Sequence, residues 1–255
     1  MFKRAIGRLY KDYLPPALLI VAFVGFWEVA VRLLSVPRYI LPAPSRVAST
    51  ILAKQSLLFG HTLVTLGEIG AGFMVALIVG VGLAVMLFHF SILERAIYPF
   101  IIASQTVPVF AIAPLLIVWF GYGIIPKVIM AAIIVFFPIV VNTVDGLRSA
   151  DEDAVNLLRI MKANRLGILV KVRFPAALPF IFSGAKIGVA VSAIGAVIGE
   201  WVGSTKGLGY LMIHANAQLQ IDLIFAAIFY LSVMAVGLFG LFSFIEWLSL
   251  PWRRV

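Results

Sequence analysis

Few side chains in this sequence have the types and spacing that enzyme chemistry requires. The three histidines, His61, His89 and His214, lie far apart, no His-Glu-x-x-His pair occurs, and there is no cysteine. Zinc sites need several such ligands together, and thiol nucleophiles and disulfides need cysteine. The sequence also lacks the Gly-x-x-x-x-Gly-Lys-Ser/Thr loop that cradles nucleotide phosphates. We therefore predict no catalytic residue, no metal site and no cofactor in this chain.

Two charged residues, Glu68 and Lys186, lie inside otherwise apolar stretches. Charges within membrane segments are costly and usually face a bundle interior or a cavity. The pair either lines a pore, with Lys186 facing an anionic group of a substrate, or forms a structural ion pair between two helices. We favour the structural pair. Glu28 is expected to anchor or pack its helix, and Glu200 and Asp222 to lie at the membrane interface, within reach of a binding protein.

Polar and aromatic side chains within the apolar runs are further candidates for a transport pathway. Such a pathway has mostly apolar walls with a few polar groups. Small polar residues are equally suited to close contacts between membrane helices, and the sequence leaves both uses open. Beside Glu68 and Lys186, the candidates are Gln105, Thr106, Phe110, Asn142, Thr143, Ser183 and Ser192.

The composition is that of a membrane protein. Hydrophobic residues make up 63% of the 255 residues and charged residues only 12%, whereas soluble chains have roughly 45–50% and 25%. The formal net charge of +9 does not indicate a nucleic-acid partner, because the basic residues lie between apolar runs and form no single face. The chain is expected to form one all-α domain in a lipid bilayer.

Six runs are long enough to cross the hydrocarbon core as helices. They lie near 14–36, 61–88, 96–119, 125–145, 176–199 and 222–248. Pro108 and Pro114 predict an irregular third span. The first run is longer than a signal-peptide core and lacks a clear cleavage site, so we expect an uncleaved membrane helix.

Lysine and arginine are distributed unequally between the two sides, and cytoplasmic loops carry the excess. With the N-terminus inside a bacterial cell, thirteen lie on the cytoplasmic side, namely Lys3, Arg4, Arg8, Lys11, Arg95, Arg148, Arg159, Lys162, Arg165, Lys171, Arg173, Arg253 and Arg254. Six lie outside, namely Arg32, Arg38, Arg46, Lys54, Lys127 and Lys206. Both termini are therefore predicted to be cytoplasmic, in a multi-pass protein of the bacterial plasma membrane.

A charged segment, DEDAVNLLRIMKANRLGILVKVRFP, interrupts the apolar sequence between the fourth and fifth runs. Val155, Leu158, Met161 and Leu166 recur at near-helical spacing, and acids at the start favour a helix N-terminus. Such an amphipathic helix either lies on the lipid surface or fills a groove on a soluble partner. The acids favour a protein partner, with Leu158 and Met161 inserted in its groove.

This segment resembles the cytoplasmic loop of permease subunits of binding-protein-dependent ABC importers. Their pattern, Glu-Ala-Ala, three residues, Gly, nine residues, Ile, one residue, Leu-Pro, falls on Asn156-Leu157-Leu158, Lys162, Val172 and Phe174-Pro175. The spacing of the pattern is kept, but most of its residue types differ. ALPFIFSGAKIGVAVSAIGAVIGEWVGSTKGLGYLM, QTVPVFAIAPLLIVWFGYG and FFPIVVNTVDGLR are also similar to the branch importing nitrate, sulfonates, taurine and vitamin precursors.

The resemblance implies a type I ABC importer permease fold of about six transmembrane helices. Residues 1–60 would hold the first span and an outer connection, 61–250 the permease core with a coupling helix within 152–167, and 251–255 a cytoplasmic tail. It implies that ATPase coupling involves Asp153, Asn156, Leu157, Leu158, Met161, Lys162 and Arg165. It places an outer gate at Gly207, Gly209 and Tyr210.

The resemblance also implies partners. These are an ATPase dimer that binds ATP and Mg²⁺, an extracytoplasmic substrate-binding protein and a second copy of this chain. The aromatic segments FFPIVVNT and WFGYG, with the Leu-Leu and Lys of the loop, resemble permeases for pyrimidine or flavin vitamin precursors more than those for sulfonates, which implies a vitamin precursor as the substrate. The alternatives are a nitrate, sulfonate or taurine importer and, in another class, a channel or scaffold subunit without an ATPase.

Overall fold

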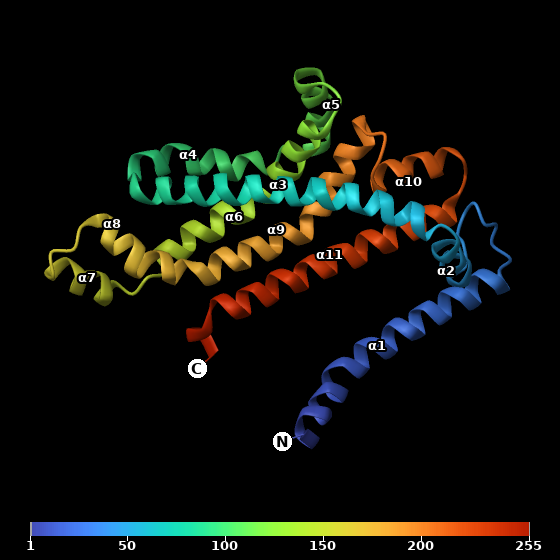
Figure 1. Ribbon diagram of the computed structural model, residues 1–255, viewed down its shortest axis with the longest axis horizontal. Coiled ribbons are helices and arrows are strands. Elements are labelled where there is room, and N and C mark those ends of the chain that lie inside the picture. The colour runs from blue at the N-terminus through green and yellow to red at the C-terminus, as the bar shows by residue number, and fades with distance from the viewer. Residues whose placement is uncertain (1, 255) are drawn as a thin grey trace. The chain divides into compact units, whose positions relative to one another are not determined.

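The computed structural model describes residues 2–254, with side chains from Leu14 to Trp252. Six of the basic residues used for the orientation, Lys3, Arg4, Arg8, Lys11, Arg253 and Arg254, therefore have side chains outside the described part. Every regular element from 2 to 254 is helical (Figure 1). The prediction of an all-α fold is confirmed.

The helices that could span a membrane follow the apolar runs. Five are long and apolar enough, and a sixth span results if the bent pair α4 and α5 is counted as one. The spanning elements are α1 (Phe2–Leu33), α3 (Gln55–His89), α4 (Ser91–Ser104) with α5 (Val109–Phe120), α6 (Ile124–Arg148), α9 (Phe174–Gly203) and α11 (Ile221–Ser249). The shorter elements are α2 (Pro44–Ala53), α7 (Glu152–Ile160), α8 (Arg165–Ile168), a π-helical turn (Leu169–Arg173), α10 (Leu208–Ala217) and a 3₁₀ turn (Pro251–Arg254).

The predicted irregularity in the third span is a sharp bend. The axes of α4 and α5 differ by 102°, and Pro108 stands directly before α5. Proline fixes its own φ, lacks an N–H and disfavours a helical residue before it, so one continuous helix cannot form. Pro99 and Pro114 lie inside the two helices without ending either.

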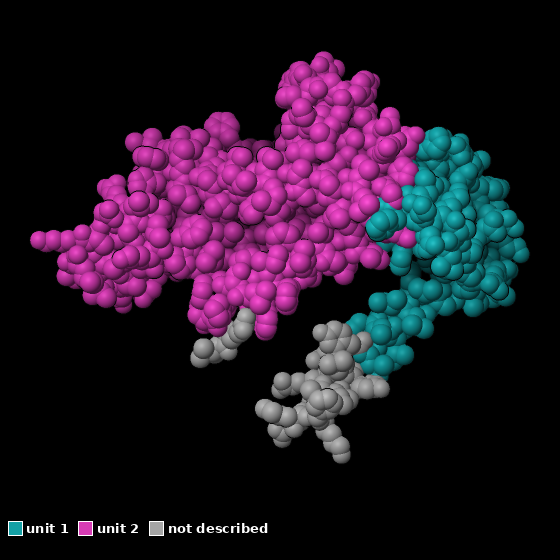
Figure 2. Space-filling view, viewed as in Figure 1, with its two compact units in different colours: residues 1–59, 211–229 teal, residues 60–210, 230–255 magenta. Residues whose placement is uncertain are grey.

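The chain divides into two compact units, residues 1–59 with 211–229 and residues 60–210 with 230–255 (Figure 2). In the first unit, Glu28 of α1 holds the start of α2: its carboxylate accepts the Ser45 N–H at 2.9 Å and the Ser45 hydroxyl at 2.7 Å. In the same unit, Thr50 of α2 donates to Asp222 at 2.8 Å. Trp27 packs on Phe225, with ring centroids 5.3 Å apart.

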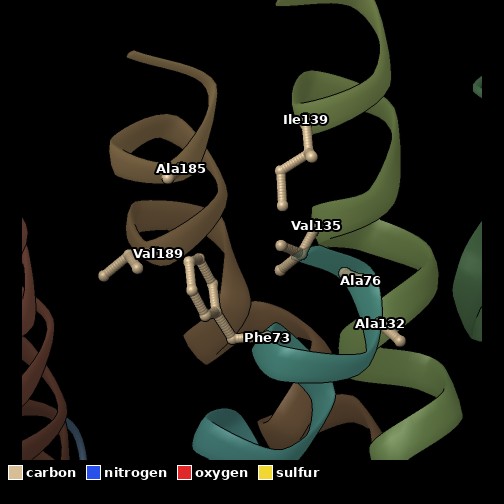
Figure 3. Packing of buried hydrophobic residues seen from close by; sticks show 7 residues of the cluster. All are labelled: Phe73, Ala76, Ala132, Val135, Ile139, Ala185 and Val189. Carbon is tan, nitrogen blue, oxygen red and sulfur yellow. The ribbon is translucent and has the colours of Figure 1, made fainter. Parts of the chain in front are cut away.

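In the second unit, α6 and α9 pack closely because glycines line the α9 face. A Cβ on Gly184 would lie 2.6 Å from the Pro138 carbonyl oxygen, and one on Gly195 would lie 2.8 Å from the Ala131 Cα. Small residues let membrane helices approach in this way. Phe73 and Ala76 of α3 complete a core with buried residues of α6 and α9 (Figure 3). This core is the rigid body that positions the sites at both ends of the unit.

Candidate functional site

The charged loop between α6 and α9 forms a short helix, α7, with defined ends. Asp151 caps its start by accepting the Asp153 N–H at 3.1 Å. At its end, the Ala163 N–H donates to the Leu158 carbonyl and the Lys162 N–H to the Arg159 carbonyl, both at 2.9 Å. This pattern is a Schellman motif, whose first residue beyond the helix is left-handed and usually glycine. Here that residue is Lys162, with φ of 58°.

The apolar residues of α7 lie on two opposite faces. Successive helical residues are about 100° apart, so Leu157, Ile160 and Met161 share one face and Val155 lies opposite. Val155 is fully buried, whereas Ile160 and Met161 are 80% and 67% exposed. We call Leu157, Ile160 and Met161 the docking patch. Of the two residues predicted to enter a partner groove, Met161 belongs to this patch and Leu158 lies beside it, half-buried, whereas Val155 is buried within this chain.

The other predicted coupling residues surround this patch. Asn156 accepts a hydrogen bond from Arg159 at 3.1 Å. Among these predicted coupling residues, Leu158 is half-buried. The side chains of the others are exposed, namely Asp153, Asn156, Lys162 and Arg165. Ile160 was missed from the sequence, although its i, i+3 spacing from Leu157 is the signal that reveals it.

Arg173 ties α7 to the helix bundle. Its guanidinium pairs with Glu152 at the start of α7 at 3.1 Å. It also donates to the Leu147 carbonyl near the end of α6 at 3.1 Å and lies 4.8 Å from the ring centroid of Phe88 in α3. One side chain thus joins α7 to the ends of two spans.

A buried ion pair occupies the opposite end of this unit, where Figure 1 shows α5 and the C-terminal end of α9. Lys127 Nζ lies 2.8 Å from Glu68 Oε1 and donates to Ser204 Oγ at 2.7 Å. The residues Glu68 and Lys127 are 2% and 8% exposed. The predicted pairing of Glu68 with Lys186 is therefore wrong, and Lys127 is not an exposed loop residue. The first turn of α6 carries Lys127 into the bundle.

Glu200, near the end of α9, organises the turn that leads into α10. It accepts the Thr65 hydroxyl at 2.6 Å, the Gly209 N–H and, at 3.3 Å, the Tyr210 N–H. Thr65 in turn accepts the Leu208 N–H at 2.9 Å. Glu200 is only 1% exposed, so its carboxylate is not available on the surface of this chain, and its position at the membrane interface stays a prediction. The carboxylate is buried because the backbone amides that start α10 need acceptors, and it supplies them.

The glycines of the predicted outer gate fit tightly around this carboxylate. Gly207 has φ of 115°, and a Cβ there would lie 2.2 Å from the Glu200 carboxyl carbon. A Cβ on Gly209 would lie 2.9 Å from Glu200 Oε2. His61 Nδ1 accepts the Gly207 N–H at 2.9 Å. The imidazole ring of His61 stacks on the ring of Tyr210, with ring centroids 6.2 Å apart. Only glycine meets both the conformation and the space at position 207.

Lys186 pairs with Glu246 of α11, whose carboxylate oxygen lies 2.6 Å from the ammonium nitrogen. Both side chains are partly accessible, at 22% and 16%, and the ring centroid of Phe239 is 6.0 Å from the ammonium. Lys186 thus has a structural partner. That partner was not among the predicted site residues.

The remaining pathway candidates are not brought together in one site. Asn142, Thr143, Ser183 and Ser192 each donate to a carbonyl of their own helix, whereas Gln105, Thr106 and Phe110 are exposed around the bend between α4 and α5. The described residues contain no group of three or more His, Cys, Asp or Glu placed to hold a metal ion.

A bundle of spans with a broken third span and an outward-facing amphipathic helix in a loop is the architecture of a membrane transport subunit. Residues 72–253 match the family described as "Binding-protein-dependent transport system inner membrane component". The chain belongs to this family, and it is the permease subunit of an ABC importer and a multi-pass protein of the plasma membrane.

Several relatives match almost end to end. A probable ABC transporter permease protein of Haemophilus influenzae is 43% identical over 92% of this chain and 95% of its own length. A formylaminopyrimidine transport permease protein of Halalkalibacterium halodurans is 37% identical over 94% of this chain and 96% of its own length. A riboflavin transport system permease protein of Chloroflexus aurantiacus is 40% identical over 98% of this chain and 94% of its own length.

The fold is shared with a solved transporter. The inward-facing MetNI methionine ABC transporter matches with a TM-score of 0.59 and 20% identity, covering 76% of this chain and 94% of that one. The predicted type I importer fold is thereby confirmed.

Proposed function

We propose that two copies of this chain form the pathway of an importer for a heteroaromatic vitamin precursor, driven by a separate ATPase that binds α7. The observation that carries the ATPase contact is the docking patch. Three large apolar side chains lie exposed on a helix whose opposite face is anchored by the fully buried Val155. An amphipathic helix that presents such a face fits an apolar groove on a partner.

The charges of the loops support the orientation in this proposal. Arg159, Lys162, Arg165, Lys171 and Arg173 follow one another at the α7 end without an intervening acid. An excess of arginine and lysine in short loops favours the cytoplasmic side. The docking patch then faces the compartment that contains ATP and Mg²⁺, and the α5 end faces the binding protein.

The contacts of Arg173 support the coupling. An ATPase that closes would displace α7, and Arg173 joins α7 to the Leu147 carbonyl of α6 and to Phe88 of α3. Beyond these contacts, α6 and α9 are packed closely through glycines, so the proposal requires them to move as one body. Closure on one side is thereby converted into movement of whole helices.

The docking proposal is tested by changing Ile160 and Met161 together to Asp in the complete transporter. Neither side chain is packed in this chain, so membrane insertion and permease yield should be unchanged. ATPase recovered on affinity-tagged permease should fall by more than about tenfold, since each buried apolar side chain contributes roughly 1.5–3 kcal/mol.

The matched control replaces the same residues by Leu, which keeps the patch apolar and should retain the ATPase. Full recovery of the ATPase with the Asp variant would refute docking through this patch.

The substrate class is supported by the relatives at 37% and 40% identity, whose names specify formylaminopyrimidine and riboflavin. A putative aliphatic sulfonates transport permease protein of Bacillus subtilis is less similar, at 28% identity. No described lysine is left for a substrate anion inside the bundle of the second unit, because Lys127 and Lys186 are both paired with carboxylates. An unpaired lysine in the bundle would have favoured a sulfonate or nitrate.

The test uses vesicles that contain the permease, its ATPase and its binding protein. ATP-dependent uptake of labelled formylaminopyrimidine or riboflavin is expected, with little uptake of taurine or nitrate. Uptake of taurine or nitrate alone would establish the anion importer instead.

A further inference from the structure

A cavity of about 490 Å³ lies at the α7 end of the second unit, separate from the docking patch. Its walls come from the end of α3, the end of α7 and the segment that leads into α9. The lining residues are Phe88, His89, Arg159, Ala163, Arg165, Ile168, Leu169 and Arg173. Three of these eight residues are arginines, and none is acidic.

The charges around this cavity sum to an excess of positive charge. Arg173 is compensated by Glu152 at 3.1 Å, and Arg159 contacts only the neutral amide of Asn156 among the described side chains. Arg165 has no ion-pair partner among residues 14–252. Two guanidinium groups therefore face the cavity without a counter-charge. Arginine presents a planar fork of N–H donors that matches the oxygens of a phosphate group.

The ends of two candidate spanning helices lie at this cavity. α3 ends at His89, which lines the cavity, and α9 begins at Phe174, directly after the lining residue Arg173. Large apolar side chains next to it in sequence are exposed, namely Phe90, Ile92, Leu166 and Val170. A basic cavity with an apolar surround suits a ligand that has both an anionic head and hydrocarbon chains.

We propose that this cavity binds the phosphate group of an anionic phospholipid headgroup from the cytoplasmic leaflet. Arg159 and Arg165 hold the phosphate oxygens, and the exposed apolar residues contact the acyl chains. A free phosphate shares the charge chemistry but makes no use of the apolar surround. The cytoplasmic assignment rests on the orientation proposed above.

The two faces of α7 would then have different partners. Arg159 lies on the same side of the helix as the buried Val155, about 40° from it around the axis, whereas the docking patch lies opposite. A headgroup bound to Arg159 and Arg165 links the end of α7 to the start of α8. The lipid therefore supports α7 on the face that carries Arg159, while the ATPase contacts the docking patch on the opposite face.

The test measures the melting temperature of the purified full-length permease in neutral detergent, without an ATPase. Phosphatidylglycerol is added to one sample and phosphatidylcholine with the same acyl chains to another. We expect phosphatidylglycerol to raise the melting temperature by about 2–4 °C more than phosphatidylcholine, the shift typical of a ligand that contributes about 1 kcal/mol in a chain of this size.

The increment should disappear in the double variant Arg159→Gln and Arg165→Gln, whose native side chains are exposed and form no described ion pair. The single variant Arg165→Gln, which removes no described ion pair, should retain less than the wild-type increment. The double variant Lys162→Gln and Lys171→Gln removes the same charge outside the cavity and should keep the increment.

Equal increments in all variants, or the same loss in the lysine control, would overturn the site. A rise produced by inorganic phosphate alone, as large as that with phosphatidylglycerol, would show a free phosphate as the ligand and overturn the lipid assignment. Because no ATPase is present, these results are independent of the docking experiment.

Discussion

The two ends of the second unit hold their charged groups in opposite ways. At the α5 end, the side chains of Glu68, Lys127 and Glu200 are almost fully buried. Glu68 and Lys127 pair with each other, and Glu200 accepts hydrogen bonds from backbone amides. At the α7 end, Arg159, Lys162 and Arg165 are exposed, beside an apolar patch that this chain leaves uncovered. Buried pairs fix a geometry, whereas exposed charges and apolar groups are available to partners. The first end therefore holds a defined geometry, and the second presents groups that a partner can contact.

The largest effect is expected from breaking the buried pair. Lys127→Met leaves the Glu68 carboxylate uncompensated, which should lower the free energy of unfolding by about 3–5 kcal/mol. The double variant Lys127→Met with Glu68→Gln should recover most of this loss, because removing both partners of a buried pair is often nearly neutral. The melting temperatures of both variants in detergent give the comparison. A single variant as stable as the wild type would show that the pair does not hold this end together.

Gly207→Ala should destabilise the same end of the unit, by an amount comparable to the loss expected for Lys186→Met. The new Cβ meets the Glu200 carboxylate in a backbone conformation that alanine rarely adopts, and strain of this kind costs about 1–3 kcal/mol. Gly237→Ala is the matched control, since a Cβ there meets nothing within 4 Å, and alanine in a helix is stabilising. Loss of stability at position 207 with no loss at 237 is the expected result. Equal stability of the two variants would contradict a tight gate turn.

Lys186→Met tests an ion pair that is less buried than Glu68–Lys127 and more buried than the exposed charges at the α7 end. Its partner Glu246 is partly accessible, so the loss should be smaller than at Lys127, about 1.5–3 kcal/mol for a charged hydrogen bond. Restoration of stability by adding Glu246→Gln would confirm the structural pairing. A stable Lys186→Met protein that has lost uptake would assign Lys186 to substrate contact instead.

Lys162→Gly should produce the smallest change, and in the opposite direction. Lys162 occupies a left-handed position at the end of α7, which costs a non-glycine residue roughly 1 kcal/mol. Glycine there should make α7 more resistant to hydrogen exchange, whereas Lys171→Gly, in a right-handed turn, should make its own segment less resistant. Faster exchange of α7 in the Lys162→Gly variant would contradict the motif.

The sequence was sufficient to locate the spans but not to find which charged side chains within them pair with each other. Apolar runs and prolines located six spans and the broken third, because hydropathy and proline chemistry act locally. The partner of Glu68 could not be found in this way. α3 has 35 residues and is therefore about 52 Å long, far longer than the hydrocarbon core, so position in the run does not give depth. Lys127 was counted among the basic residues of the outer side and not considered as a partner of Glu68, because it stands at the start of a run and span ends are uncertain by a few residues.

The coupling helix shows the same division. Its charge and its amphipathic character are readable in 151–175, but which of its two apolar faces points outward depends on what packs behind Val155. That is a tertiary contact, with no signal in the periodicity of one helix. Glycine at 207 was predictable as a turn residue, whereas the Glu200 carboxylate around which it turns was not.

The bend between α4 and α5 restricts what can surround this molecule. Residues 105–108 belong to neither helix and are exposed, in the middle of what would otherwise be one span. Hydrocarbon provides no hydrogen bonds for irregular backbone, so such a segment is not tolerated against lipid tails. It has to face water or another polypeptide. A single copy in a bilayer would leave a non-helical segment against the acyl chains, so this surface must become either the wall of a hydrated passage or the seam with a neighbouring subunit.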